Sequence, residues 1–192
     1  MGRKRTINRD ALLDAAEAIV TEEGAGSLTF DAIARRAGVS KGGVLYCYAS
    51  KQELVAAMTR RDLDRFLREV EEKRETLAGG AEAGMRAHLA ATRDEIGALA
   101  ARAASLMATL AESPDHAEVL RDYYRDRLEL FGGDERARVA FFAAEGAFLL
   151  RGLGLVDLPE TAWRALFDRI EQELVVPERG DADRRTNAKT HR

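Results

Sequence analysis

The 192-residue sequence predicts an all-α fold, and three observations support that prediction. The chain is 46% hydrophobic and 33% charged, and its long stretches rich in Ala, Leu, Arg and Glu are typical of helices, because these side chains lose little freedom there. Only three prolines interrupt it. No run of alternating β-branched and aromatic residues bounded by turns indicates a strand.

The N-terminal quarter predicts three short helices. Apolar residues recur at helical spacing from Arg9 until two glycines end the pattern. A second helix is predicted from Thr29, a good N-cap residue, to Gly38, whose residue type suits the left-handed position after a helix. Ser40 can then cap a third helix that reaches Tyr48.

The remaining sequence predicts six longer helices. Ser50 and Glu53 form the S-x-x-E pattern of a capping box, which opens a long helix ending at an Ala-Gly-Gly stretch. Ser113 and Pro114 are predicted to cap a later helix. After the long helix, the others are expected near residues 82–93, 95–112, 115–131, 134–154 and 160–175. Residues 177–192 lack large apolar side chains and are expected to be disordered.

The second and third helices, joined at Gly38, have the lengths and spacing of a helix-turn-helix. Ala34 would be small because the two helices cross beside it, and Val44 would return a hydrophobic contact from the second helix of the motif to the first. That second helix would enter the major groove of DNA. The alternative is a short, weak helix packed on a larger domain.

The proposed recognition helix contains a glycine pair, Gly42 and Gly43, each of which should cost about 1 kcal/mol relative to alanine. Without a Cβ, both would let the backbone approach a phosphate closely at the helix N-terminus. Lys41 and Lys51 bracket the helix as expected phosphate ligands. Tyr46 is the best side chain for reaching a phosphate or a thymine methyl group.

The stretch LTFDAIARRAGVSKGGVLYCYASKQELVAAM, residues 28–58, resembles the DNA-binding domain of TetR-family transcriptional regulators, whose usual pattern here is similar to VSKGxLYxHFxSKExL. The resemblance implies a homodimer that binds a double-stranded, palindromic operator. It places these residues at the DNA: Thr29, Arg35 or Arg36, Ser40, Lys41, Gly42, Gly43, Leu45, Tyr46, Cys47 and Lys51. Leu45 and Cys47 depart from the family pattern, so the operator sequence cannot be taken from relatives.

Cys47 is the single cysteine, which excludes a disulfide within the chain. An exposed thiol beside lysines could serve as a redox switch. However, the two recognition helices of a dimer would lie roughly 34–36 Å apart, too far for a disulfide between subunits. Plain packing or a weak base contact is therefore the favoured interpretation of this residue.

The resemblance also implies that residues 1–50 form the DNA-binding domain, and that residues 51–176 bind a small-molecule effector and dimerise through the last two long helices. Large apolar residues in those helices are the candidates for the dimer interface: Phe148, Leu149, Leu153, Trp163, Leu166, Phe167 and Ile170. The alternative is that both helices belong to the internal core.

Candidates for the ligand pocket are Met, aromatic and other apolar residues of the middle helices, together with one histidine: Phe66, Met85, His88, Leu89, Leu106, Met107, Leu110, Tyr123, Tyr124 and Phe142. His88 and a tyrosine would be polar handles among apolar walls, which implies a mostly apolar ligand with one or two polar atoms. Each of these residues is equally compatible with plain core packing.

No sequence pattern indicates catalysis, a cofactor or a metal site, since the three histidines are far apart and no P-loop, nucleophile elbow or Rossmann glycine pattern is present. The N-terminus lacks the apolar core of a signal peptide, and the most apolar segment, residues 139–156, is interrupted by Glu145 and Arg151. We therefore expect a cytoplasmic protein without a membrane span.

Together these features predict a TetR-like regulator, a repressor that a small ligand releases from its operator. The principal alternative is a regulator of the same fold that acts constitutively or through a protein partner. A helical enzyme is a more remote alternative.

Overall fold

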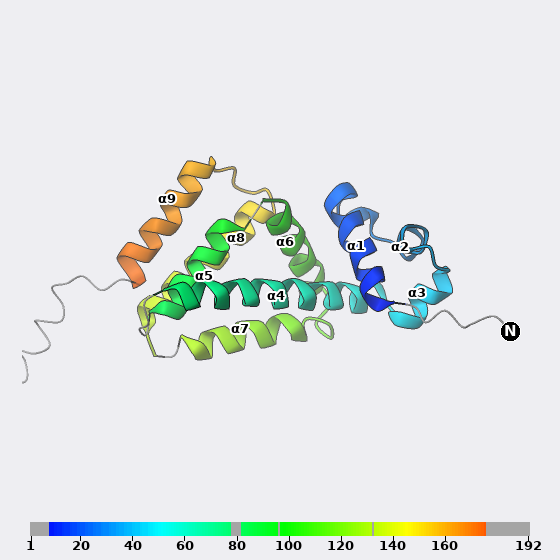
Figure 1. The fold of residues 1–192 in the computed structure, drawn as a ribbon, viewed down its shortest axis with the longest axis horizontal. Coiled ribbons are helices and arrows are strands. Elements are labelled where there is room, and N and C mark those ends of the chain that lie inside the picture. Colours follow the sequence, from blue (N-terminus) through cyan, green and yellow to red (C-terminus); the bar gives the residue numbers. More distant parts are fainter. Residues whose placement is uncertain (1–7, 78–81, 96, 132, 176–192) are drawn as a thin grey trace, which may run out of the picture.

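The computed structural model describes residues 8–77, 82–95, 97–131 and 133–175, which form nine α-helices and no strand (Figure 1). The helices are α1 (Arg9–Glu23), α2 (Phe30–Ala37), α3 (Lys41–Cys47), α4 (Lys51–Thr76), α5 (Ala83–Asp94), α6 (Gly97–Ala111), α7 (Glu118–Leu130), α8 (Glu135–Gly152) and α9 (Glu160–Ile170). The all-α prediction is confirmed. None of the described helices is both long enough and apolar enough to cross a membrane.

The long helix α4 connects the two ends of the molecule. Helices α1, α2 and α3 gather around its N-terminal end, and α5, α6 and α7 pack along the rest of its length (Figure 1). Helix α8 packs on α5 and α6, and α9 packs on α5 and α8. A 3₁₀ turn, Ala25–Ser27, separates α1 from α2, and a π-helical turn, Glu171–Val175, continues α9. The expected disorder of residues 177–192 lies outside the described residues.

Side-chain caps define the starts of the N-terminal helices, as predicted. The hydroxyl of Thr29 accepts a hydrogen bond from the backbone N–H of Ala32 (3.2 Å), and that of Ser50 accepts one from Glu53 (3.0 Å). The Glu53 carboxylate accepts the N–H of Ala49 (2.7 Å), one residue before the N–H that a standard capping box uses. Each bond satisfies a backbone N–H that the helix itself leaves free.

The predicted cap at Ser113 and Pro114 is wrong. The backbone N–H groups of His116 and Ala117 donate to the carbonyl oxygen of Ser113 (2.9 and 3.1 Å), which closes a turn, and α7 begins only at Glu118. Proline tolerates this turn because it needs no backbone N–H there. No side-chain cap replaces the predicted one at the start of α7.

Two large hydrophobic clusters support the fold. The first joins the N-terminal helices to α4, α6 and α7, and its members include Leu12, Ile19, Ile33, Val44, Leu54, Met58, Leu106, Leu110 and Tyr123. The second lies among α5, α8 and α9 and includes Met85, Leu89, Phe141, Trp163 and Phe167. Because α6 and α7 contribute to the first cluster, the N-terminal helices share their core with the C-terminal part. The domain boundary after residue 50 stays a prediction.

Helices α6 and α8 approach each other closely at Gly152. A Cβ on this glycine would lie 2.7 Å from the carbonyl oxygen of Ala100 and 2.7 Å from the Cβ of Ala104. Both contact atoms belong to buried, inflexible parts of α6. The absence of a side chain at residue 152 therefore sets the distance between the two helices.

We predict that Gly152→Ala destabilises the protein by about 1–3 kcal/mol, the usual cost of overpacking a dense core. Chemical denaturation would measure this change. Gly84→Ala in α5 is the matched control, because a Cβ there meets no atom within 4 Å. The control should leave stability unchanged or raise it, and equal effects of the two substitutions would contradict the predicted close approach.

Candidate DNA interface and internal cavity

The helix-turn-helix has the packing that its sequence predicts. Ile33 and Val44 are fully buried, and Ala34 is 6% exposed between α2 and α3. Gly38 adopts the left-handed conformation (φ 66°), and the N–H of Val39 donates to the carbonyl oxygen of Ala34 (3.0 Å). This turn holds α3 at a defined angle to α2.

The outward face of α3 carries an aromatic side chain that the protein itself leaves largely uncovered. Tyr46 is 87% exposed, the highest value among the large hydrophobic residues of the described chain, and Leu45 is 41% exposed. Lys41 and Gly42 lie on the same exposed surface. The other candidates on the exposed surface are Thr29, Arg35, Arg36, Ser40 and Lys51.

Two predicted DNA contacts face the protein interior. Gly43 and Cys47 are buried on the inner side of α3, so neither can approach a phosphate or a base without a rearrangement. The buried thiol fits plain packing, one of the two favoured interpretations of Cys47, and does not fit the alternative of an exposed redox switch. Backbone clearance applies only to Gly42, where a Cβ would meet nothing closer than the Ser40 hydroxyl at 3.9 Å. The spacing of residues in a helical sequence shows which of them share a face of the helix. Which face is covered depends on the neighbouring helices.

Arg9 connects the end of the recognition helix to α1. Its guanidinium donates a hydrogen bond to the carbonyl oxygen of Cys47 and lies over the ring of Tyr48, 5.1 Å from the ring centre. A cation at a helix C-terminus also interacts favourably with the helix dipole. Both ends of α3 are thus held, by Ser40 at the start and by Arg9 at the end.

Two of the expected phosphate ligands form exposed ion pairs within the protein. The Lys41 ammonium lies 2.8 Å from the Asp31 carboxylate, and the Arg36 guanidinium lies 2.5 Å from that of Glu22. Exposed pairs of this kind contribute about 0–1 kcal/mol, so a DNA phosphate could replace either carboxylate at little cost. The carboxylates therefore orient the side chains of Lys41 and Arg36 but leave them able to bind a DNA phosphate instead.

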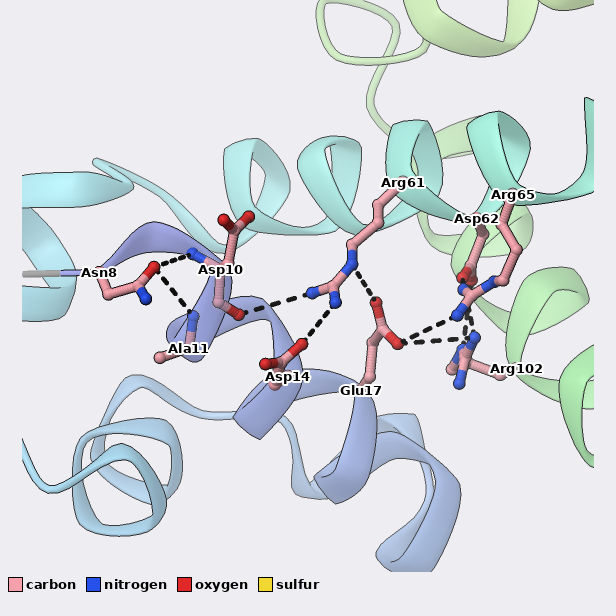
Figure 2. Close-up of polar contacts among 9 residues, drawn as sticks. All are labelled: Asn8, Asp10, Ala11, Asp14, Glu17, Arg61, Asp62, Arg65 and Arg102. Carbon is pink, nitrogen blue, oxygen red and sulfur yellow. Dashed lines mark hydrogen bonds and ion pairs between the residues drawn. The ribbon is translucent and has the colours of Figure 1, made fainter. Parts of the chain in front are cut away.

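A buried ionic network joins α1, α4 and α6 (Figure 2). Arg102 of α6 is 7% exposed and binds Asp62 of α4 through two nitrogens, at 2.8 and 3.2 Å. The same guanidinium lies 3.8 Å from the carboxylate of Glu17 in α1, which Arg61 and Arg65 of α4 also approach, at 3.5 and 3.7 Å. One arginine of α6 therefore contacts both the first helix and the long connecting helix.

An internal cavity lies between α4, α5, α6, α7 and α8, with an empty volume of about 470 Å³ that includes its opening to solvent. Its lining residues are Thr59, Asp62, Leu63, Phe66, Thr92, Glu95, Ala103, Leu106, Met107, Tyr123, Glu145 and Phe148. Asp62 belongs both to this lining and to the ionic network.

Glu145 is the centre of a buried hydrogen-bond cluster beside the cavity. Tyr124 donates its hydroxyl to the carboxylate at 3.1 Å and Tyr123 at 3.5 Å, while Nε2 of His88 lies 3.2 Å away. Burial, followed by the negative charge of Glu145, raises the pKa of both tyrosines. The tyrosines therefore stay protonated and serve as hydrogen-bond donors.

Four of the predicted pocket residues line the cavity: Phe66, Leu106, Met107 and Tyr123. The other six do not. Met85, Leu89 and Leu110 are buried in the hydrophobic clusters. His88 and Tyr124 contact the carboxylate of Glu145 without lining the cavity themselves. Phe142 is 60% exposed on the outside of α8. Sequence reasoning missed the acidic residues of the wall, although Glu145 interrupts an apolar segment and is a recognisable signal of a polar site.

Four of the predicted dimer residues are occupied within the subunit. Trp163, Phe167 and Ile170 are buried in the second hydrophobic cluster, and Phe148 lines the cavity. The indole N–H of Trp163 donates to the carbonyl oxygen of Arg93 (2.9 Å). These four positions are corrected to internal packing, because the apolar face of α9 turns towards α5 and α8. Leu149 is half-buried, and Leu153 and Leu166 are exposed.

Among the described residues, no group of three or more His, Cys, Asp or Glu side chains is placed to hold a metal ion. The helix-turn-helix, with the outward face of its second helix exposed, defines the class of the protein: a DNA-binding transcriptional regulator of the helix-turn-helix type.

Family comparisons agree with this class. Residues 12–58 match the model of the bacterial regulatory proteins of the tetR family, and residues 82–174 match that of the tetracyclin repressor-like C-terminal domain. Together the two models cover well over half of the chain. The chain belongs to the TetR family of transcriptional regulators. A comparison of the sequence with curated proteins found no match.

Several solved structures share the fold. The multidrug binding protein EbrR, complexed with imidazole, is 19% identical, with a TM-score of 0.68 over 91% of this chain and 98% of EbrR. A transcriptional regulator from Rhodococcus sp. Rha1 is 23% identical (TM-score 0.66, 90% and 100% covered). The fatty acid degradation regulator FadR from Bacillus halodurans is 20% identical (TM-score 0.66, 92% and 99% covered). At these identities the likeness shows the fold alone.

The cavity residue Glu95 should make stability depend on pH. The pKa of Glu95 is raised from the ordinary value of 4.5 to about 7, and burial is the largest cause. The negative charges of Asp62, Glu69 and Glu145 also raise this pKa, whereas the positive charge of Arg102 lowers it. A pKa that folding raises means that stability is fully present below 4.5 and is lost as the pH rises through about 7. The thermal unfolding midpoint should fall across this window, and Glu95→Gln should flatten the dependence.

The control for this measurement is Glu118→Gln, since Glu118 is exposed at the start of α7. It should preserve the pH dependence of the parent protein. A Glu95→Gln variant with the parent's pH profile would show that another group is responsible.

Proposed function

We propose that this protein is a homodimeric repressor, which binds a palindromic operator through paired recognition helices and releases it when a small ligand enters the internal cavity. The observation that carries the proposal is the outward face of α3, where Tyr46 is 87% exposed on a helix held at both ends. A rigid helix with an uncovered aromatic side chain is suited to reading a major groove. Because its operator lies on cellular DNA, the repressor would act in the cytoplasm.

The proposed DNA contacts divide into two kinds. Positive and hydroxyl side chains would hold the phosphates, and Leu45 and Tyr46 would reach base edges. Gly42 would let the start of α3 approach the DNA backbone closely, because this exposed position carries no Cβ. The phosphate contacts proposed are Thr29, Arg35, Arg36, Ser40, Lys41 and Lys51, all exposed.

The proposed dimer interface is the outer face of α8 with part of α9. Val139, Phe142, Leu150 and Leu153 are 55%, 60%, 45% and 44% exposed, and their spacing puts them on one side of the helix. Leu166 of α9 is 36% exposed. A second copy that covers these side chains would form a four-helix interface with two-fold symmetry.

The ionic network offers a route from the cavity to the DNA-binding helices. A ligand that displaces Asp62 would disturb Arg102, and with it the contact to Glu17 on α1. Because α1 packs against α2, a shift of α1 would change how the recognition helices of a dimer match successive grooves. The ligand need only bind the non-matching arrangement more tightly than the DNA-bound one.

A solved structure with the same fold supports a ligand-responsive function. EbrR, whose structure complexed with ethidium has a TM-score of 0.67 and 20% identity to this chain, is described as a multidrug binding protein. That description belongs to EbrR, and for this chain it favours a ligand-responsive regulator over one that acts constitutively.

Operator binding tests the proposal directly. Footprinting on DNA around the encoding gene would supply the operator, and Tyr46→Ala should then weaken binding about tenfold or more, since a base contact contributes about 1–3 kcal/mol. The exposed position predicts an unchanged unfolding midpoint. Tyr48→Ala is the matched contrast, because Tyr48 is 4% exposed and its truncation should destabilise the fold. Undiminished operator affinity of Tyr46→Ala would exclude Tyr46 from the interface.

The route through Glu17 has its own test. Glu17→Gln keeps the shape of the side chain but removes the charge that faces Arg102, so a ligand found by thermal-shift screening should still bind but release the operator less. The coupling between ligand and operator should fall by about 1–3 kcal/mol, the usual size of such couplings. Asp14→Asn is the control, because Asp14 pairs with Arg61 and has no ion pair with Arg102 among the described residues. Equal coupling in both variants would contradict this route.

A further inference from the structure

We propose that the cavity recognises a protonated amine with an apolar body, whose ammonium group is held by Glu145, Glu95 and the hydroxyl of Thr59. The inference rests on the proposed ligand-responsive function and specifies the chemistry of the ligand. The sequence predicted a mostly apolar ligand with one or two polar atoms, and the inference specifies that the polar group is positively charged.

The first argument is the charge balance around the cavity. Three carboxylates line it, from Asp62, Glu95 and Glu145. Asp62 is already neutralised, because Arg102 binds it through two nitrogens and Arg65 pairs with it as well. The other two carboxylates determine which ligand charge the cavity favours.

Glu145 has hydrogen-bond donors but no cation among the described residues. Tyr123 and Tyr124 are neutral donors, and the third contact is His88. Nδ1 of this histidine is buried and has no hydrogen-bond partner, and its ring lies 5.3 Å from that of Phe66 and 5.2 Å from that of Phe141. Glu145 therefore has no arginine or lysine partner among the described residues.

Glu95 adds a second carboxylate to the same region. It follows α5 and is partly buried, and burial, then Asp62, Glu69 and Glu145, raise its pKa to about 7. The charge of Arg102 is the opposing influence on this pKa, and that guanidinium is committed to Asp62. A bound cation would favour the ionised form of Glu95.

Thr59 provides an independent sign of a missing partner. Its side chain is 2% exposed, lines the cavity, and its hydroxyl has no hydrogen-bond partner within the described chain. A buried hydroxyl without a partner is costly, and a ligand N–H group would satisfy it. A hydroxyl can donate or accept, but the ionised carboxylates beside it only accept, so an ammonium group, which donates to all of them, suits the set.

The remaining wall selects against other ligands. Leu63, Phe66, Leu106, Met107 and Phe148 are apolar, and suit a hydrocarbon or aromatic body. The two carboxylates would repel a ligand anion. An uncharged apolar ligand would remove water from these carboxylates and offer them no hydrogen bond in return. A small hydrated metal ion would leave this apolar wall uncovered. The ring of Phe66 is also a favourable neighbour for an organic cation.

Calorimetric titration of the full chain without DNA tests the inference, with three probes that share a skeleton: phenylbutylamine, phenylbutanol and phenylbutyrate. At neutral pH they are cationic, uncharged and anionic. The amine should bind about tenfold more tightly than the alcohol, because hydrogen bonds to charged partners are the stronger kind. The carboxylate should bind weakest.

Glu145→Gln and Glu95→Gln keep the size of each side chain and remove its charge, so each should reduce the preference for the amine. Glu118→Gln is the matched control, because Glu118 is exposed at the start of α7 and does not line the cavity. Thermal unfolding of each variant would verify that it folds. If either Glu145→Gln or Glu95→Gln destabilises the protein, the other variant still tests the inference.

The outcomes separate this inference from the proposed repressor function. Equal binding of amine and alcohol, no binding of the amine, or an amine preference that persists in both glutamine variants of the cavity would overturn the inference. If the amine binds as expected but leaves operator affinity unchanged, the ligand chemistry holds and the proposal of ligand-induced release fails.

Discussion

The buried guanidinium of Arg102 is the interaction on which the arrangement of the two parts depends. A charge that is 7% exposed is tolerated only where partners replace its water, and here Asp62 supplies two hydrogen bonds while Glu17 adds a second negative charge. These partners come from α4 and α1, so one side chain of α6 holds three helices in register. Removal of a partner would leave a buried charge without full compensation. The three helices are therefore held in a defined arrangement rather than free to slide past one another.

Close packing of α8 on α6 extends this constraint to the cavity. Gly152 lets α8 contact the backbone of α6, and α6 then presents Leu106 and Met107 to the cavity on the same helix that carries Arg102. A ligand in the cavity therefore touches the element that contacts α1. The carboxylates of the cavity differ in their partners: Asp62 pairs with Arg102 and Arg65, whereas neither Glu95 nor Glu145 pairs with an arginine or a lysine among the described residues.

Local features of the sequence predicted most of the fold and of the DNA-facing surface. Thr29, Gly38 and the Ser50–Glu53 pair act through neighbouring backbone groups, so their roles can be inferred without knowledge of distant contacts. The prediction at Ser113 failed because a turn used its carbonyl oxygen before a helix could start. The cavity was predicted less well, since its acidic wall is assembled from α4, α8 and the residue after α5, which lie far apart in the sequence.

The sequence by itself determined the all-α class, the positions of the helices and the helix-turn-helix, because spacing, caps and glycines act over a few residues. Only the tertiary structure decided which side of each helix is covered. It turned Gly43 and Cys47 inward and left Gly42 and Tyr46 outward, and it buried Trp163 and Phe167 against α5 and α8. The physical reason is that an apolar stripe must be covered, but its period does not say by which neighbour.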